Sequence, residues 1–265
     1  MKIWTVSCQK GGVGKTTTVV TLGGLLASRG YKTLLVDLDP HGSLTSYFRM
    51  NPDAIEKSGY DLFRAVMDKS KVNIHASIVE TDIDGLSIVP AATAMATLDR
   101  QAGGLDGMGL VMVNALAQLS EEYDYVLLDT PPMLGVLLVN ALAACERLLI
   151  PVQTEFLAVK GLERMMRTVQ MINRSRAQPI PYTIVPTMYD QRTRASIESL
   201  NALRNRYGRE LWKEVVPVDT KVREASRLGV PASICMPNSR AVHAYEKLLE
   251  SLLHRRTGSV QKMAM

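Results

Sequence analysis

A glycine-rich segment near the start of the chain places the strongest constraint on the fold. It runs from Gln9 to Thr18, directly after the apolar run Ile3–Val6 and directly before a long helical pattern. Strand, glycine loop and helix in this order form the setting that a phosphate-binding loop requires. A glycine-rich turn without a ligand is the alternative, but the sequence Gly-Lys-Thr in this setting argues against it.

Each part of this segment has a separate task in holding the phosphates of a nucleotide. The glycines allow successive backbone N–H groups to point at phosphate oxygens, and the N-terminus of the following helix adds a positive dipole end. Lys15 is expected to reach the β- and γ-phosphates, and the Thr16 hydroxyl to ligate Mg²⁺. The predicted nucleotide-binding residues of the loop are Gly11, Gly12, Val13, Gly14, Lys15, Thr16 and Thr17.

The loop departs from the pattern G-x-x-x-x-G-K-[ST] at its first position. Gln9 stands where the first glycine is usual, and a second lysine, Lys10, precedes the loop glycines. This lysine cannot easily bend back to the phosphates of its own loop. It could, however, reach a nucleotide held by a second copy of the chain that faces it.

Lys10 and the glycine loop after it resemble the deviant Walker A motif of the ParA/MinD ATPases. The resemblance implies ATP and Mg²⁺ as cofactors, and an ATP-dependent homodimer in which Lys10 acts catalytically across the interface, together with Lys15. In dimers of that family, the segment after the run Leu148–Val152 lies near the partner. The resemblance therefore implies that Glu155 and Lys160 are interfacial.

Two later apolar runs end in carboxylates. The first ends at Asp37 and Asp39, and the second ends at Asp129. Ligands of parallel sheets bind at the carboxyl ends of strands, so these side chains are expected beside the phosphates. Asp39 is predicted to orient the attacking water and, with Thr16 and Asp129, to hold Mg²⁺. Its alternative role, as the initiator of an Asp-Pro turn, is weaker because it follows a strand end.

Both strand ends also carry family features. The segment that begins at Asp39 is similar to switch I of ParA-like proteins, which usually reads D-x-D-P-Q-G-N. His41 and Ser43 depart from the glutamine and asparagine of that pattern, and these departures bear on the hydrolysis rate rather than on the nucleotide site. The Asp-x-Pro-Pro turn at Asp129 resembles switch II.

Apolar runs alternate with helical patterns along the whole chain. This alternation predicts an α/β protein of the P-loop NTPase fold, with a mostly parallel, twisted sheet covered by helices on both faces. Because the 265 residues contain no Pro/Gly/Ser-rich linker, one domain is expected over residues 1–254, followed by a polar tail, 255–265. The glycines between 103 and 109 follow no strand, so a loop is expected there rather than a second phosphate site.

Two loops in the second half are expected to flank the base of the nucleotide. The first follows the run Tyr182–Pro186 and contains Met188, and the second lies at a predicted strand end, Val215–Thr220, with Pro217 and Asp219. ParA relatives usually have Pro-Arg-Asn in the second loop, where this chain has Pro217-Val218-Asp219. Between strands, a helix is predicted over 162–176.

Charge is unevenly distributed along the chain. Residues 1–150 carry 12 Lys and Arg against 16 Asp and Glu, whereas residues 151–265 carry 19 against 10. The basic half is a candidate surface for polyanions, including nonspecific DNA bound through its phosphates. Solvated arginines are the alternative. The DNA contacts predicted first flank the two base loops, and they are Arg192, Arg194, Lys221 and Arg223.

Composition also excludes several classes of protein. No run of about 18 apolar residues occurs and Met1 leads directly into an apolar run, so neither a membrane span nor a signal peptide is expected and the protein is predicted to be cytoplasmic. Cys8, Cys145 and Cys235 are odd in number and far apart, which predicts reduced thiols rather than a redox pair or a zinc cluster. The polar tail lacks the apolar face of a membrane-lying helix.

The resemblance to ParA-like proteins extends from Lys2 to His254. Segments 153–157, 184–190 and 192–196 are similar to the branch that serves chemotaxis clusters in polarly flagellated bacteria. That branch implies an ATPase that cycles between monomer and ATP-sandwich dimer and places chemotaxis arrays at the cell pole through an array-associated adaptor protein. The alternative is a chromosome or plasmid partition ATPase that binds nonspecific DNA. A MinD/FlhG-like membrane regulator and a metabolic P-loop enzyme are less favoured.

Overall fold

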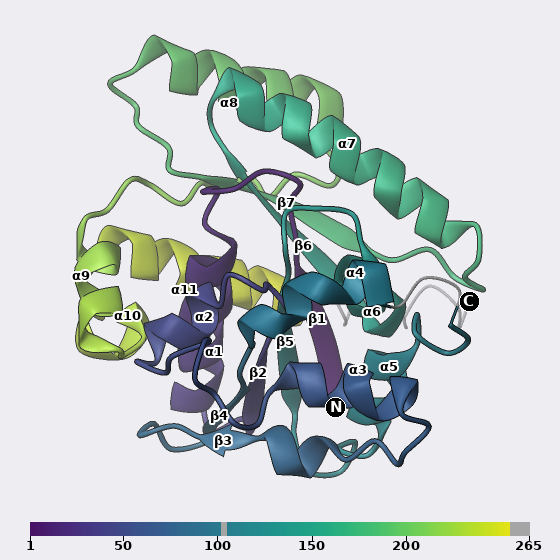
Figure 1. Ribbon diagram of the computed structural model, residues 1–265. Helices are drawn as coiled ribbons and strands as arrows, with labels where there is room; N and C mark the ends of the chain where they lie inside the picture. The colour runs from purple at the N-terminus through teal and green to yellow at the C-terminus, as the bar shows by residue number, and fades with distance from the viewer. Residues whose placement is uncertain (102–104, 255–265) are drawn as a thin grey trace, which may run out of the picture.

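A central β-sheet organises the molecule (Figure 1). The structure is a computed structural model that describes residues 1–101 and 105–254. Within these residues, seven strands form one sheet in the order β3-β4-β2-β5-β1-β6-β7. All neighbouring strands are parallel except the edge pair β3–β4, so the predicted mostly parallel α/β fold is confirmed. The strands are β1 (Lys2–Val6), β2 (Thr33–Asp37), β3 (Val79–Glu80), β4 (Leu86–Val89), β5 (Tyr125–Asp129), β6 (Arg147–Gln153) and β7 (Tyr182–Thr187).

Helices cover both faces of the sheet because its central strands are apolar on both sides. Every residue of β2 and β5 is buried, which requires a layer on each face. The helices are α1 (Lys15–Ser28), α2 (Ser43–Tyr47), α3 (Gly59–Met67), α4 (Leu98–Gln101), α5 (Val111–Ala117), α6 (Val136–Ala144), α7 (Phe156–Asn173), α8 (Arg194–Tyr207), α9 (Lys221–Leu228), α10 (Ala232–Cys235) and α11 (Arg240–His254). Two short 3₁₀ helices, η1 (Ile74–Ser77) and η2 (Thr93–Thr97), lie in the connections around β3 and β4.

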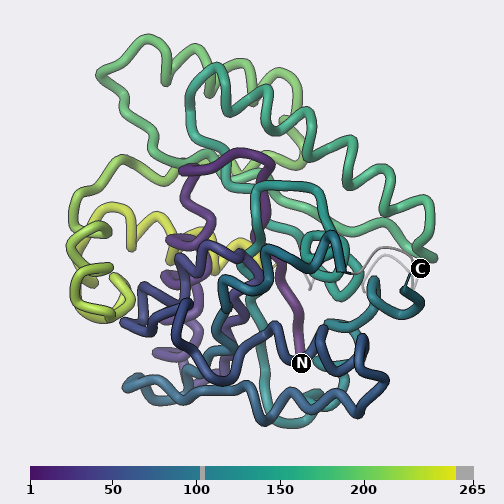
Figure 2. Tube along the Cα trace, in the orientation of Figure 1, coloured from purple at the N-terminus to yellow at the C-terminus, as the bar shows by residue number. Residues whose placement is uncertain are grey.

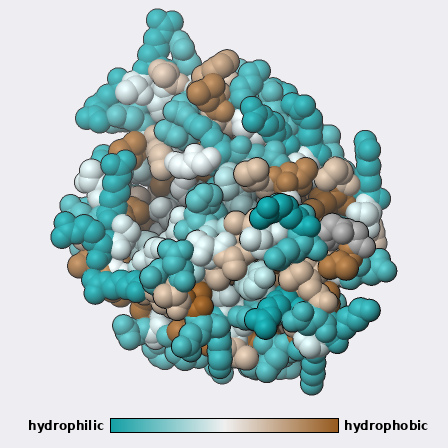
Figure 3. Space-filling view, in the orientation of Figure 1, coloured by the Kyte–Doolittle hydropathy of each residue, from teal (hydrophilic) through white to brown (hydrophobic). Residues whose placement is uncertain are grey.

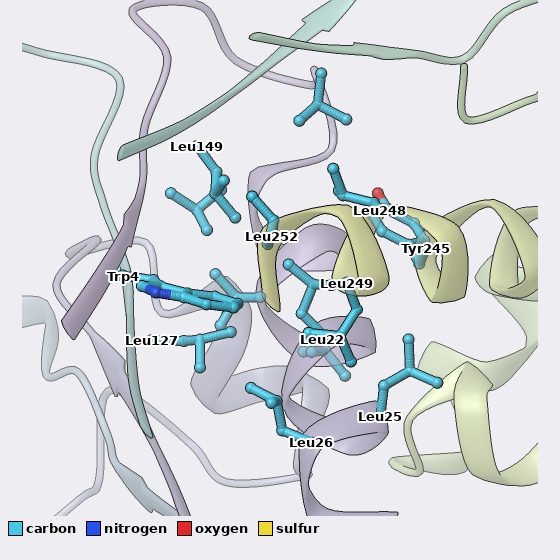
Figure 4. Packing of buried hydrophobic residues seen from close by; sticks show 14 of the residues in the cluster. Trp4, Leu22, Leu25, Leu26, Leu127, Leu149, Tyr245, Leu248, Leu249 and Leu252 are labelled. Atoms are coloured by element: carbon cyan, nitrogen blue, oxygen red, sulfur yellow. The ribbon is translucent and has the colours of Figure 1, made fainter. Parts of the chain in front are cut away.

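Alternate residues along each strand point into different layers of the core. Leu35 and Leu127 pack with α1 and α11 on one face, in the cluster around Trp4 that Figure 4 shows. Leu34 and Val126 pack with α3, α5 and α6 on the other face. A third cluster fills the space between β6, β7, α7 and α8.

The remaining surface is mostly polar on the side that Figure 3 shows, where apolar residues occur in small separate areas. Among the described residues, no helix combines the length and the apolarity that crossing a membrane requires. The predictions for Gly103, Gly104 and the polar tail at 255–265 lie outside the described residues.

Two sequence-based expectations about elements were wrong. Residues 215–220 form no strand; their pairing is an isolated bridge between Tyr189 and Pro217, because the chain then turns into α9, where the Asp219 carboxylate accepts from the N–H of Lys221. Helix α7 begins at Phe156 rather than at 162. Its first turn exposes Phe156 and Leu157, so apolar residues at its start do not mark the core-facing side.

Arg176 connects the end of α7 to the end of α6. Its guanidinium donates hydrogen bonds to the carbonyl oxygens of Leu142 (3.0 Å), Ala143 (2.7 Å) and Cys145 (3.0 Å). The last carbonyls of a helix have no partner within the helix, so this arginine satisfies them and places a positive charge at the negative end of the α6 dipole.

We expect Arg176→Ala to lower the free energy of unfolding by about 1–3 kcal/mol, because partly buried carbonyl groups lose their donors. Chemical denaturation measures the change. Arg174→Ala is the matched control, because Arg174 is an exposed arginine two residues away and its loss should have little effect. Equal midpoints for the two variants would show that the contact to α6 contributes nothing.

Candidate functional site

The carboxyl ends of β1, β2 and β5 meet at one edge of the sheet. Val6 at the end of β1 is level with Asp129 in β5, and Asp37 at the end of β2 is level with the same residue. The glycine loop follows β1 directly, and Figure 2 shows its purple trace turning back at this edge into α1. The sheet register alone therefore brings two of the predicted carboxylates level with the start of the loop.

The loop has the backbone conformation that its glycines allow. Gly12 (φ 73°) and Gly14 (φ 90°) adopt left-handed conformations, which residues with a Cβ rarely adopt. Gly14 immediately precedes α1, and in this fully described helix no side chain caps the N-terminus and the first turn carries no acidic residue. Its first N–H groups and its positive dipole end are therefore available to an anion.

Lys15 is held close to this loop. The residue is only 8% exposed, and its Nζ lies 3.4 Å from the backbone oxygen of Lys10 at the start of the loop. Burying a charged ammonium group is costly unless an anionic partner lies beside it. The side chain is therefore placed to meet the phosphates of a nucleotide held by the loop.

The residues predicted to hold Mg²⁺ fit a divalent ion. Thr16 Oγ1 donates a hydrogen bond of 2.6 Å to Asp129 Oδ2. Asp129 is 1% exposed, and its Oδ1 is buried without a hydrogen-bond partner among the described residues. Hydroxyl and carboxylate oxygens are the ligands that Mg²⁺ takes in proteins. An ion beside Thr16 and Asp129 would satisfy the unpartnered oxygen.

Asp39, the third residue predicted at the metal, lies at the same edge but is already engaged. It is 8% exposed, and its Oδ1 accepts hydrogen bonds from the backbone N–H of His41 (3.1 Å) and from the ring Nδ1 of His41 (2.8 Å). Its other carboxylate oxygen is the one available to a water molecule or an ion.

Asp37 has a bracing role that the sequence did not indicate. Its carboxylate accepts hydrogen bonds from the N–H of Asp39 (3.1 Å) and from both the N–H and the hydroxyl of Thr45 (2.8 Å each). The Thr45 oxygen in turn accepts from the N–H of Ala91 (2.8 Å). This network fixes the segment between β2 and α2 to the end of β4. No local pattern marks Thr45, because its partners are distant in the sequence.

The segment after Asp129 is held at both ends. Thr130 Oγ1 donates to the backbone oxygen of Val6 (3.0 Å), and Asp99 Oδ1 accepts from the N–H of Val136 (2.6 Å). A Cβ on Gly135 would collide with the Asp99 carboxylate, so a side chain at this position would displace Asp99. Between these anchors Met133 and Leu134 are 73% and 49% exposed. Asp99 was missed because its contact is made across 37 residues.

The paired carboxylates at the sheet edge resist ionisation. Burial raises the pKa of Asp37. Burial, and then the nearby charge of Asp37, raise the pKa of Asp129, although the hydrogen bond from Thr16 and the charge of Lys15 act in the opposite direction. Two buried like charges are costly unless a cation is present. A divalent ion would relieve this repulsion.

Both loops predicted to flank the base line one cavity of about 330 Å³ beside the glycine loop. Met188 has a left-handed backbone (φ 52°), a costly conformation for a residue with a side chain. Its Cε lies about 4.0 Å from where a Cβ on Gly14 would stand. The cavity residues are Gly14, Thr17, Gln153, Thr187, Met188, Val216, Pro217, Val218, Asp219, Thr220, Val222, Arg223, Ala241 and Tyr245. Gln153, Thr187 and Tyr245 were not predicted.

The side chain of Asp219 is used to hold its own loop. One oxygen accepts from the N–H of Lys221 (3.0 Å) and the other from the N–H of Ala241 (3.2 Å). These groups lie at the N-termini of α9 and α11. Asp219 therefore shapes the cavity wall by fixing two helices, and its loop offers Pro217 and backbone groups to a ligand. Thr187 similarly fixes the glycine loop, because its hydroxyl donates to the Val13 oxygen (2.8 Å).

Lys10 lies outside the phosphate cradle of its own chain. Its ammonium group pairs with Glu155, the residue that immediately precedes α7. The neighbouring Gln9 donates to Thr168 in α7 (2.9 Å), so α7 lies along the start of the loop. The structure thus brings Lys10 and Glu155 together, while Lys160 pairs with Glu163 one turn further along α7.

The four basic residues predicted at DNA differ in their surroundings. Arg192 forms a bidentate pair with Asp190 (2.9 and 2.7 Å). This pair lowers the pKa of Asp190 to about 2. Arg194 pairs with Glu198 (2.6 Å). Lys221 and Arg223 lie on α9, and Arg223 lines the cavity described above. Two of the four charges are therefore partly neutralised within the chain.

We expect Lys15→Gln to weaken the binding of a fluorescent ATP analogue by about 100-fold, which corresponds to the loss of a charged contact of about 3 kcal/mol. The fold should persist, as circular dichroism can verify. Lys71→Gln, at an exposed lysine, is the control. Wild-type affinity in Lys15→Gln would show that this loop does not hold the phosphates.

Asp129→Asn should change how stability depends on pH. The pKa of an aspartate in the unfolded chain is about 3.9. Above this pH, the raised pKa of Asp129 means that the folded chain binds more protons than the unfolded chain. The free energy of unfolding therefore falls as the pH rises. The variant keeps an acceptor for Thr16 but does not titrate.

The melting temperature of the ligand-free variant should therefore rise relative to that of the wild type between about pH 5 and pH 8. Asp82→Asn, at an exposed carboxylate, should follow the wild type throughout. A constant difference between Asp129→Asn and wild type would mean that burial does not raise this pKa.

The similarity of this chain to known proteins agrees with the geometry of the site. Residues 1–180 match the profile of a family described as "AAA domain". The chain is 32% identical over 252 residues to the sporulation initiation inhibitor protein Soj of Bacillus subtilis, covering 95% of this chain and 98% of that protein. It is 30% identical over 267 residues to the chromosome partitioning protein ParA of Caulobacter vibrioides, covering 100% and 98%.

Two solved structures with a similar fold contain nucleotides. Cobyrinic acid a,c-diamide synthase from Mycobacterium smegmatis, with a bound ATP analogue and magnesium, has a TM-score of 0.81 and 30% identity over 98% of this chain and 97% of that one. A putative plasmid partition protein from Borrelia burgdorferi, bound to AMPPNP, has a TM-score of 0.79 over 96% and 99%. At 24% identity the latter shows the fold alone.

Proposed function

We propose that this chain, which belongs to the family of the Soj and ParA partitioning proteins, is a cytoplasmic ATPase that acts as a molecular switch. The observation that carries the proposal is the meeting of Lys15, Thr16 and Asp129 at the carboxyl ends of β1 and β5. The relative that binds an ATP analogue with magnesium supports the same cofactors here.

The residues of the chain divide the work of hydrolysis. The loop N–H groups and Lys15 bind the phosphates, and Thr16 and Asp129 hold Mg²⁺, which when bound neutralises charge on the phosphate oxygens. Asp39 orients the attacking water by accepting a hydrogen bond from it. The water oxygen bonds to the γ-phosphorus as the bond from that phosphorus to the bridging oxygen breaks, which yields ADP and phosphate and releases a proton.

A diamide synthase among the structural relatives raises the alternative of a metabolic enzyme. Within residues 1–101 and 105–254, Cys8 and Cys145 are buried and Cys235 is partly buried, and burial raises the pKa of all three thiols, that of Cys8 and of Cys145 to about 11. Thiols of that kind are poor nucleophiles at neutral pH. The side chains and loop amides at the site are arranged to bind phosphates and an ion. This arrangement favours a molecular switch over a synthase.

The switch is proposed to be an ATP-sandwich homodimer formed through the face around the loop. Gly11 and Gly12 are exposed there, and a hollow beside Gln9 is lined by Met133 and Leu134. Phe156 and Leu157, next to Glu155, are 70% and 65% exposed. Large apolar side chains at a surface are typical of protein interfaces when they are grouped. Lys10 lies within this face and could reach a partner's nucleotide after leaving Glu155.

Lys10→Ala should separate nucleotide binding from dimerisation, because its ammonium group is proposed to serve the nucleotide of the partner. The variant should bind an ATP analogue as tightly as wild type but remain monomeric by light scattering with ATP and Mg²⁺. Lys32→Ala removes an exposed lysine beside the start of β2, at the opposite edge of the sheet, and should dimerise normally. Dimerisation and hydrolysis by Lys10→Ala at wild-type levels would remove the case for this interface.

The cargo proposed for the switch is a chemotaxis array, positioned at the cell pole through an array-associated adaptor protein as in the ParC branch of the ParA-like ATPases. The resembling segments surround the site: Gln153 and Met188 line the base cavity, and Glu155 pairs with Lys10. The in-chain pairing of Arg192 and Arg194 leaves less free positive charge for DNA phosphates. Chromosome or plasmid partition through nonspecific DNA remains the second candidate, favoured by the names of the relatives.

A DNA-binding titration with ATP distinguishes the two candidates. The array-positioning function predicts no retardation of nonspecific duplex even at low salt. A partition function predicts binding that falls steeply with salt as counterions are released, and its loss when Arg192, Arg194 and Lys221 are replaced by alanine. Arg223 is left intact because it lines the nucleotide cavity. Replacing Lys57, Lys69 and Lys71 by alanine provides a control of equal charge.

A further inference from the structure

Asp39 is held from two sides. Its backbone N–H donates to the buried Asp37 (3.1 Å), and its side-chain Oδ1 accepts from the N–H and the ring Nδ1 of His41. The His41 side chain is 79% exposed, whereas that of Asp39 is 12% exposed. The imidazole therefore lies on the solvent side of the carboxylate and covers one of its two oxygens.

The backbone that carries His41 is itself fixed. Gly42 donates to the backbone oxygen of Asp39 (2.8 Å) and has a left-handed conformation (φ 61°). A Cβ on Gly42 would collide with the ring of Pro52, so the turn is packed against the segment after α2. The position of the His41 backbone relative to Asp39 is thus set by the fold.

The direction of the hydrogen bond between His41 and Asp39 is defined. An ionised carboxylate oxygen only accepts hydrogen bonds, so Nδ1 must carry the hydrogen in this pair. Two donors on Oδ1 hinder rotation of the carboxylate and leave Oδ2 as the oxygen that can accept from a water molecule. Orientation that is fixed before the substrate binds lowers the barrier to reaction.

We propose that His41 is a positioning residue for ATP hydrolysis: its ring holds Asp39 so that Oδ2 meets the attacking water. This inference rests on the proposed ATPase function. His41 does not touch the phosphates in this account and acts only through Asp39. The chain therefore uses a histidine where the resembling switch I pattern has glutamine, and the difference acts on the rate of hydrolysis.

The first test compares substitutions that move or keep the donor atom. His41→Ala should lower kcat by about 10-fold, since a misplaced group costs up to about 100-fold, while KM for ATP stays unchanged. The side-chain nitrogen of asparagine can stand where Nδ1 stands, so His41→Asn should restore most of kcat. The nitrogen of glutamine lies one bond further out, so His41→Gln should be slower than His41→Asn. Wild-type kcat in His41→Ala would overturn the proposal.

His75→Ala is the matched control. His75 also makes a bond of 2.8 Å to a carboxylate, Glu122, and is half exposed, but it lies in η1, away from the edge of the sheet that holds the glycine loop. Its loss should leave kcat unchanged. A fall in kcat equal to that of His41→Ala would show that loss of any such surface contact slows the enzyme, and would contradict a specific role for His41.

A double-mutant cycle decides whether His41 acts through Asp39. In single-turnover assays, His41→Ala should have no further effect in an Asp39→Ala background. Equal effects of His41→Ala in both backgrounds would overturn the positioning role. If the wild-type protein binds ATP but does not hydrolyse it, the proposed function itself fails; if it hydrolyses ATP and the cycle is additive, only the role of His41 fails.

Discussion

The contact between Thr16 and Asp129 is the point on which the site depends. It joins the first turn of α1 to the end of β5 across the loop, with a bond of 2.6 Å. The parallel register of β1, β2 and β5 brings Asp37 level with the same aspartate. Burial makes these charges costly without a cation, so we propose that this edge of the sheet binds one. Lys15, Asp39 and the loop amides are arranged around this edge.

The local parts of this arrangement could be predicted from the sequence. Glycine, lysine and threonine at fixed spacing, and aspartates at the ends of apolar runs, are patterns in which neighbours in the sequence are also neighbours in space. The α/β fold with its mostly parallel sheet followed from the same alternation of runs and is confirmed. Thr16 meets Asp129 beside the loop, and Gly14 lines the base cavity.

Contacts between distant segments that neither a motif nor a strand end marks could not be predicted. Thr45 braces Asp37 while reaching the end of β4, and Glu155 meets Lys10 across 145 residues. The left-handed backbone of Met188 gives no signal in the sequence. The predicted strand at 215–220 was wrong, because the chain turns into α9 after a single bridge at Pro217, and Asp219 is occupied by the N-termini of two helices. The cargo is also absent from these patterns, since the site recognises the nucleotide and not what the switch moves.

The central claim, that Thr16 and Asp129 hold a divalent ion together with the nucleotide, is tested most directly by electron paramagnetic resonance with Mn²⁺ in place of Mg²⁺. We expect the wild-type protein with ADP to bind Mn²⁺ tightly, and Asp129→Asn to bind Mn²⁺ much more weakly while still binding ADP through the loop and Lys15. An unchanged Mn²⁺ affinity in Asp129→Asn would contradict the claim and move the ion to other residues.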